Sequence, residues 1–294
     1  MGKNIPIMAI VYDFDGTLSP RDMQEYDFIP KLGMSSKKFW KEVQEKAQEY
    51  NSDRILTYMH CMVKKAQEKN VSVQKKKFRE FGKEVELFKG VKSWFNRINQ
   101  YAKKHDLRVE HYIVSSGILE MIMASPIRRW FKKIFASTFI YDSNDVACWP
   151  AIAVNYTTKT QFLFRINKGS LDISDDSKIN RYVPQEERPI PFERMIYIGD
   201  GSTDVPCMKL VKEQGGHSIA VYSPHKSRKK AHSLINQGRV NFVLPADYSK
   251  NKSLDKVVKS IIDKISATAR VQILEKKRYV NKARGPRNNK NEQK

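Results

Sequence analysis

The sequence predicts an α/β fold in which a doubly wound, mostly parallel, Rossmann-like sheet carries a small helical cap domain. Two observations predict it. Short apolar runs that are typical of buried strands alternate with amphipathic segments that are typical of helices. A block of charged helical sequence interrupts this alternation after the first strand. Alternating strands and helices favour a parallel sheet covered on both faces, and such sheets bind ligands at the carboxyl ends of their strands.

The first strand and the block that follows it determine the expected domain organisation. Residues 7–12 are apolar and predict a buried strand whose carboxyl end carries Asp13. Three charged, amphipathic segments then predict helices, at residues 35–51, 52–70 and 71–81. The expected domains are a helical cap at residues 20–84 and an α/β core at residues 1–19 and 85–249.

Beyond residue 85 the alternation of helices and strands resumes. We expect helices at residues 91–104 and 158–167, and strands at residues 109–114, 137–141, 195–198, 218–222 and 240–244. Residues 146–155 predict a hairpin or an irregular edge, and a basic helix is expected between the last two strands. The last section, residues 250–294, predicts a helix at residues 254–282 and then a basic, frayed tail.

Composition narrows the class of protein. The 294 residues carry a net charge of +22, which suits either a polyanionic partner such as nucleic acid or a solvated basic surface. We favour the solvated surface because the charge is spread along the chain. The chain has no apolar run of about 18 residues and no long apolar stretch at its start, so neither a membrane span nor a signal peptide is expected. Its three distant cysteines predict reduced thiols and a cytoplasmic protein.

Two acids directly follow the first strand. Asp13 and Asp15 are two positions apart, and the turn at Gly16 can direct both carboxylates to one site. One carboxylate can attack phosphorus and form an aspartyl phosphate, while the other acts as general acid and base. Because the two acids repel each other, a divalent cation is expected, and oxygen ligands favour Mg²⁺. The alternative is an Asp-Gly turn in which Asp15 caps the next segment.

Other strand ends supply further candidates. Asp200 and Asp204 follow a buried strand, and one helical turn would place them on one face, although an acidic helix N-terminus is as good an explanation. Ser115 and Ser116 end another strand before a helix and could bind a phosphate oxygen, although serine is also a common helix cap. Lys159 opens a helix and could neutralise both a phosphate and the attacking carboxylate, although most lysines are solvated.

Taken in order, these motifs resemble those of a known superfamily. Asp-x-Asp-Gly-Thr, a serine at a strand end, a lysine and Gly-Asp-x-x-x-Asp span residues 13–204 in the order seen in the haloacid dehalogenase superfamily. The resemblance implies Asp13 as the nucleophile and Asp15 as the general acid and base. It also implies phosphate binding by Ser115 and Lys159, and a Mg²⁺ ion held by Asp13, Asp200, the Asp15 carbonyl and, directly or through water, Asp204.

The resemblance also indicates a subgroup. The helical block lies between the first and second motifs, as in the small cap of phosphoserine-phosphatase-like members. Dehalogenase members lack an acid at the position of Asp15, so this residue points to phosphoryl transfer. Phosphoserine phosphatases have Glu where this chain has Asp22, which puts specificity for phosphoserine in doubt. Residues that could contact the leaving group are Arg21, Asp22, Gln24, Glu25 and Tyr26, although an N-capped helix of the cap is the favoured explanation for any one of them. Lys168 and Lys178 are alternatives for the motif lysine.

The leading hypothesis is therefore a Mg²⁺-dependent phosphomonoesterase that hydrolyses a small phosphorylated metabolite through an aspartyl-phosphate intermediate. A phosphotransferase, or a phosphatase acting on nucleic-acid ends, would keep the same chemistry, and the basic tail motivates the second of these. A non-catalytic nucleic-acid-binding protein is disfavoured, because clustered carboxylates would repel a polyanion.

Overall fold

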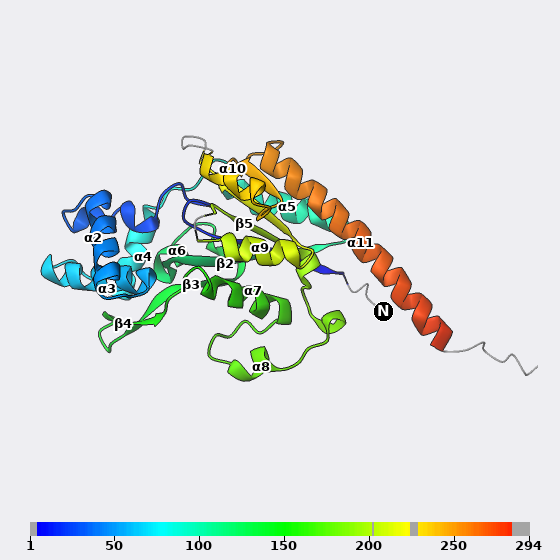
Figure 1. The fold of residues 1–294 in the computed structure, drawn as a ribbon, viewed down its shortest axis with the longest axis horizontal. Helices are drawn as coiled ribbons and strands as arrows, with labels where there is room; N and C mark the ends of the chain where they lie inside the picture. Colours follow the sequence, from blue (N-terminus) through cyan, green and yellow to red (C-terminus); the bar gives the residue numbers. More distant parts are fainter. Residues whose placement is uncertain (1–4, 202, 224–228, 284–294) are drawn as a thin grey trace, which may run out of the picture.

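Within residues 5–201, 203–223 and 229–283, which a computed structural model describes, seven strands form one sheet (Figure 1). The strands are β1 (Ile7–Tyr12), β2 (Arg108–Ile118), β3 (Phe131–Tyr141), β4 (Ala147–Ile152), β5 (Met195–Gly199), β6 (His217–Tyr222) and β7 (Phe242–Pro245). Their order is β4-β3-β2-β1-β5-β6-β7, and only the edge strand β4 is antiparallel to its neighbour. This sheet confirms the predicted α/β class.

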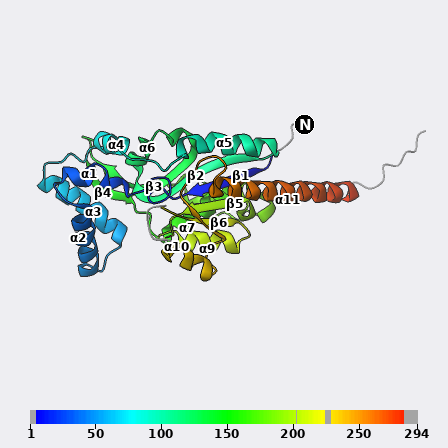
Figure 2. The same ribbon diagram turned by 90° about the horizontal axis from the view of Figure 1, so that it is seen from above.

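Strand β1 lies at the centre of the sheet, and its side chains are buried on both faces. Met8 and Ile10 pack into the apolar cluster that includes helices α5 (Val91–Lys104) and α11 (Ser253–Ala283). Ala9 and Val11 pack on the opposite side. That second cluster includes α7 (Thr158–Lys168), α9 (Val205–Glu213) and α10 (Lys229–Asn236). Because side chains alternate along a strand, the continuous apolar run of β1 serves two helical layers, which lie on either side of the sheet in Figure 2.

Register places Asp13 at the junction of three strands. Tyr12 of β1 pairs with Ile113 of β2 and with Ile198 of β5. The Asp13 amide then donates to the Ile198 carbonyl at 2.9 Å, so the ladder continues one residue beyond β1. The residue that follows the central strand is therefore held at the carboxyl edge of the sheet.

Four helices of the segment between β1 and β2 lie together beyond this end of the sheet (Figures 1 and 2). They are α1 (Phe28–Lys31), α2 (Ser36–Glu49), α3 (Arg54–Glu68) and α4 (Lys75–Lys83). Side chains start the two longest of them, because Ser35 accepts from the Lys38 amide and Asp53 accepts from the amides of Ile55 and Leu56. We refer to residues 20–84, which contain these four helices, as the proposed cap.

Several boundaries differ from those expected. Strand β2 runs on to Ile118 instead of ending before Ser115, because its pairing with β3 continues from Ser115 to Ile118 with a shift in register. Helix α6 (Leu119–Met123) therefore begins after Ile118. Helix α4 begins at Lys75 because Gln74 forms a bridge to Val146. The expected tail at residues 284–294 lies outside the described residues. The remaining short elements are α8 (Asp176–Asn180) and the 3₁₀ turns Met23–Glu25 (η1), Arg128–Trp130 (η2), Gln185–Glu187 (η3) and Phe192–Arg194 (η4).

A buried acid fastens α11 to α5. Asp255 is fully buried, and its Oδ1 accepts from Arg97 Nε at 2.9 Å. Its Oδ2 accepts from the Asn251 amide and from Lys259 Nζ. Burial alone would raise the pKa of Asp255, but hydrogen bonds from Lys259 and Arg97 lower it below its ordinary value.

We expect Asp255→Asn to lower the free energy of unfolding at pH 7 by about 1–3 kcal/mol, because it weakens charged hydrogen bonds. The folded state lowers the pKa of Asp255, so its contribution is present above the unfolded value of about 4 and is lost as pH falls through the folded value. Urea unfolding at pH 7 and pH 3 should show that the parent and the variant differ less in free energy of unfolding at pH 3. Asp263→Asn, at an acid that is 46% exposed, is the matched control.

Candidate active site

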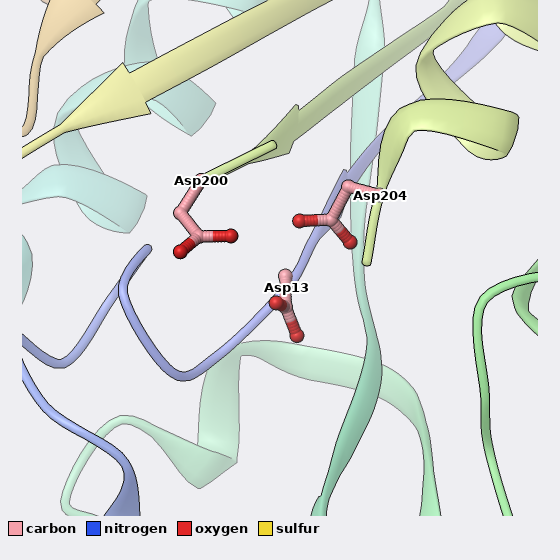
Figure 3. A group of neighbouring side chains, drawn as sticks. All are labelled: Asp13, Asp200 and Asp204. Carbon is pink, nitrogen blue, oxygen red and sulfur yellow. The ribbon is translucent and has the colours of Figure 1, made fainter. Parts of the chain in front are cut away.

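Three carboxylates converge at the carboxyl ends of β1 and β5 (Figure 3). One oxygen each from Asp13, Asp200 and Asp204 lies within 4.8 Å of the others. Close approach requires glycine beside them. A Cβ on Gly199 would lie 2.3 Å from Asp204 Oδ2, and one on Gly16 would lie 2.6 Å from Asp200 Oδ2. The expected helical turn between Asp200 and Asp204 is wrong, since β5 ends at Gly199 and α9 begins only after Asp204.

A buried lysine joins two of these acids. Lys159 is fully buried, with its Nζ 3.1 Å from Asp13 Oδ1 and 2.7 Å from Asp204 Oδ1. Burial would lower the pKa of Lys159, but the two carboxylates raise it above its ordinary value, so the ammonium keeps its charge. Lys168 Nζ donates to main-chain carbonyls and Lys178 pairs with Asp175. Of the three candidate lysines, Lys159 is the one that contacts Asp13.

The carboxylate of Asp13 is held in one orientation. Its Oδ1 accepts from the Phe14 amide at 2.7 Å as well as lying beside Lys159. Burial and the neighbouring Asp204 raise the pKa of Asp13 to about 8, against the opposing effect of Lys159. The charge of Lys159 therefore does not outweigh the effects that raise the pKa of Asp13, and a further cation beside Asp13 would stabilise its ionised form.

The donor set fits a divalent metal ion. Oδ1 of Asp204 accepts from Lys159 and from the Tyr197 hydroxyl, but its buried Oδ2 has no hydrogen-bond partner. Buried polar atoms normally have partners, so this oxygen is suited to bind a cation together with Asp13 and Asp200. A set made of carboxylate oxygens is typical of Mg²⁺ or Ca²⁺ rather than zinc.

Asp15 has a separate environment beside this cluster. Its Oδ1 accepts from the Met23 amide at 3.0 Å, and its carboxylate is not among the three converging acids. Burial, followed by the charge of Asp22, raises the pKa of Asp15 well above its ordinary value. An acid of this kind retains its proton at higher pH and can donate it.

The two serines lie in the extended part of β2. Ser115 is fully buried and its Oγ accepts from the Gly117 amide at 3.1 Å. The Ser116 hydroxyl is buried without a partner, while its carbonyl accepts from the Tyr58 hydroxyl of α3. No helix starts directly after them, so the expected helix N-terminus is displaced to Leu119, and hydroxyl groups are the candidate phosphate contacts.

A cavity of about 380 Å³ opens between the proposed cap and the strand ends. Sequence reasoning found some of its lining, namely Asp13, Asp15, Asp22, Gln24, Ser115, Ser116 and Asp200. It missed Trp40, Arg54, Ile55, Tyr58 and Tyr156, which belong to no motif, and Thr203, which occupies an unspecified position of the Gly-Asp-x-x-x-Asp motif. Arg21, Glu25 and Tyr26 are not in the lining. Arg21 lies over the Tyr26 ring, and Glu25 accepts from Trp40.

Comparisons with known proteins agree with this geometry. The family model of the haloacid dehalogenase-like hydrolases matches residues 10–209. An uncharacterized protein of Borreliella burgdorferi is 30% identical over 281 residues, which covers 86% of this chain and 96% of that protein. The chain therefore belongs to the haloacid dehalogenase-like hydrolase family, which confirms the resemblance drawn from the motifs.

Solved structures share the fold at low sequence identity. A probable phosphoserine phosphatase from Vibrio cholerae has a TM-score of 0.56 at 14% identity, covering 91% of this chain and 69% of that one. A phosphoserine phosphatase bearing an analogue of its phospho-aspartyl intermediate has a TM-score of 0.54 at 15% identity, covering 87% and 99%. A family hydrolase from Salmonella enterica serovar Typhi has a TM-score of 0.53 at 17% identity, covering 83% and 69%. Among the described helices, none is long and apolar enough to cross a membrane.

We expect Lys159→Met to lower the free energy of unfolding in metal-free buffer by about 3–5 kcal/mol, because two buried carboxylates lose their shared cation. Urea unfolding of the parent and the variant in EDTA would measure this. Lys168→Met should lower the free energy of unfolding by less, because Lys168 lies on the same helix but donates to main-chain carbonyls. Equal losses in the two variants would contradict the role assigned to Lys159.

Proposed function

We propose that this hydrolase is a Mg²⁺-dependent phosphomonoesterase that acts on a small phosphorylated metabolite through an aspartyl phosphate on Asp13. The proposal is supported chiefly by one observation. Asp13 is fixed by Lys159 and the Phe14 amide, and it lines the same cavity as Asp15, whose environment favours the protonated form.

In the first step a carboxylate oxygen of Asp13 attacks phosphorus, and the bond from phosphorus to the leaving oxygen breaks. Asp15 gives its proton to that oxygen, so the product leaves as an alcohol. Lys159 stabilises Asp13 in its ionised form, and the hydroxyls of Ser115 and Ser116, which line the cavity, would contact the phosphoryl oxygens.

In the second step water attacks the phosphorus of the aspartyl phosphate. Asp15, now ionised, takes a proton from that water, the bond between Asp13 and phosphorus breaks, and inorganic phosphate is released. Reaction of a second alcohol in place of water would give a phosphotransferase. We favour hydrolysis, in keeping with the hydrolase family to which the chain belongs.

Asp13, Asp200 and Asp204 would hold the Mg²⁺ ion, with the Asp15 carbonyl as a further ligand. When bound, the ion supplies positive charge that offsets the phosphate and the converging carboxylates. The unpartnered Oδ2 of Asp204 supports this assignment.

The size of the cavity supports a small substrate. A volume of about 380 Å³, closed on one side by the proposed cap, suits a metabolite better than a polymer. Most of the basic tail that motivated a nucleic-acid substrate lies outside the described residues. The free thiols of Cys61, Cys148 and Cys207 support a reducing compartment such as the cytoplasm.

Asp13→Asn should lower kcat for 4-nitrophenyl phosphate by about a thousandfold or more, because an amide cannot form the covalent intermediate. Phosphate release with Mg²⁺ present would measure it. Asp172→Asn, at an exposed acid on another loop, should match the parent. Activity of Asp13→Asn equal to that of the parent would remove Asp13 as the nucleophile.

Removal of metal should abolish turnover, and added Mg²⁺ should restore it and raise the unfolding temperature, because binding stabilises the folded state. Asp200→Asn should weaken Mg²⁺ binding by about tenfold or more, since it removes one charged ligand. Calorimetric titration measures the affinity independently of activity. Unchanged affinity in Asp200→Asn would refute the assignment of this ligand.

A further inference from the structure

The 3₁₀ turn η1 lies at the start of the proposed cap, between the loop that carries Asp13 and Asp15 and the helices α1 to α4. At its start, the Met23 amide donates to Asp15 Oδ1 at 3.0 Å. At its end, Glu25 Oε1 accepts from Trp40 Nε1 of α2 at 2.9 Å. The residue between these two anchors is Gln24, which lines the cavity. Gln24 therefore lines the same cavity as Asp15, the proposed proton donor, and the Trp40 ring.

Gln24 has an unusual hydrogen-bonding state. Its side chain is only 2% exposed, and its Oε1 is buried with no hydrogen-bond partner. Buried amide oxygens are nearly always paired in folded proteins. Gln24 lines the cavity to which the proposed function assigns the substrate, so an N–H or O–H group of the substrate is the candidate partner.

Two aromatic rings form a corner in the same cavity. The Trp40 and Tyr58 rings are 5.8 Å apart at 72°. Their polar atoms are already engaged, because Trp40 Nε1 donates to Glu25 and the Tyr58 hydroxyl donates to the Ser116 carbonyl. Both rings are thus fixed before substrate arrives. Tyr156 of the core also lines the cavity.

We infer that Gln24 and the Trp40–Tyr58 corner form a leaving-group subsite for a flat aromatic or heteroaromatic ring that carries an N–H or O–H donor. This inference rests on the proposed function, and it names the substrate class as phosphate esters of ring-bearing alcohols. Flat rings pack favourably against aromatic side chains in stacked or edge-to-face geometry. A short alkyl phosphate would leave both the ring corner and the Gln24 oxygen unused.

Three phosphate esters of primary alcohols separate these contributions, because their chemical steps are closely matched. Propyl phosphate has no ring, benzyl phosphate has a ring without a donor, and 3-hydroxybenzyl phosphate has both. We expect kcat/KM to rise about fivefold to tenfold from the first ester to the second. It should rise a further three- to tenfold from the second to the third.

Two variants test which residue causes each increase in kcat/KM. Trp40→Leu should remove the advantage of benzyl over propyl phosphate, and Gln24→Leu should remove the advantage of 3-hydroxybenzyl over benzyl phosphate. The matched controls are Trp149→Leu, at a tryptophan that is 69% exposed on β4, and Gln48→Leu, at an exposed glutamine on α2. Both controls should keep the parent's ranking of substrates. Unfolding temperatures show whether each variant is folded.

Failure of the subsite and failure of the proposed function give different results. Release of phosphate from all three esters at equal kcat/KM would overturn the subsite and leave the phosphatase intact. If none of the esters is hydrolysed, the proposed function fails, and calorimetric Kd values for the same esters with Asp13→Asn decide the subsite. Affinity that falls from 3-hydroxybenzyl to benzyl to propyl phosphate would then support the subsite. Equal affinities, as expected if water satisfies Gln24, would overturn the subsite.

Discussion

The contact of Lys159 with Asp13 and Asp204 is the interaction on which the rest of the site depends. Lys159 reaches these acids because the start of α7 is fixed by a reciprocal cap. The Asn155 amide donates to Thr158 Oγ1 at 2.8 Å, and the Thr158 amide donates to Asn155 Oδ1 at 3.0 Å. The lysine in the first turn therefore enters the core, where a charge would be unstable without the two carboxylates. Strands β1 and β5 and helix α7 are tied together by this charge pairing.

The same pairing explains why the site needs a further cation. Crowded carboxylates destabilise one another, and the pKa of Asp13 stays raised despite the ammonium of Lys159. A dianionic phosphate bound beside these carboxylates would add to their mutual repulsion. The cluster thus fits the proposed state in which metal and phosphate are bound together, and the glycines at positions 16 and 199 allow its acids to lie so close.

The sequence predicted those parts of the site that follow from local pattern. Asp13 and Asp200 directly follow apolar strands, and the carboxyl ends of parallel strands lie at one edge, so their convergence needed no tertiary detail. The predicted end of β2 was wrong, because the pairing of β2 with β3 beyond Ser115 depends on residues far apart in the sequence. The Ser-Ser-Gly pattern does not reveal that pairing. Trp40 and Tyr58 could not be predicted as cavity residues, since their position depends on how the cap packs on the core.

Coupling between the cap and the chemistry follows from the short turn η1. One end of the turn holds Asp15 and the other holds Trp40, so the proposed acid and the aromatic wall share one rigid segment. A second tie lies nearby, where Asn155 Nδ2 donates to Asp53 Oδ2 at 2.7 Å, at the start of α3 and just before α7. Any movement of α2 or α3 would therefore disturb the residues that fix Asp15 and Lys159. If the proposed cap closes over a substrate, these contacts would couple that closure to the positions of Asp15 and Lys159.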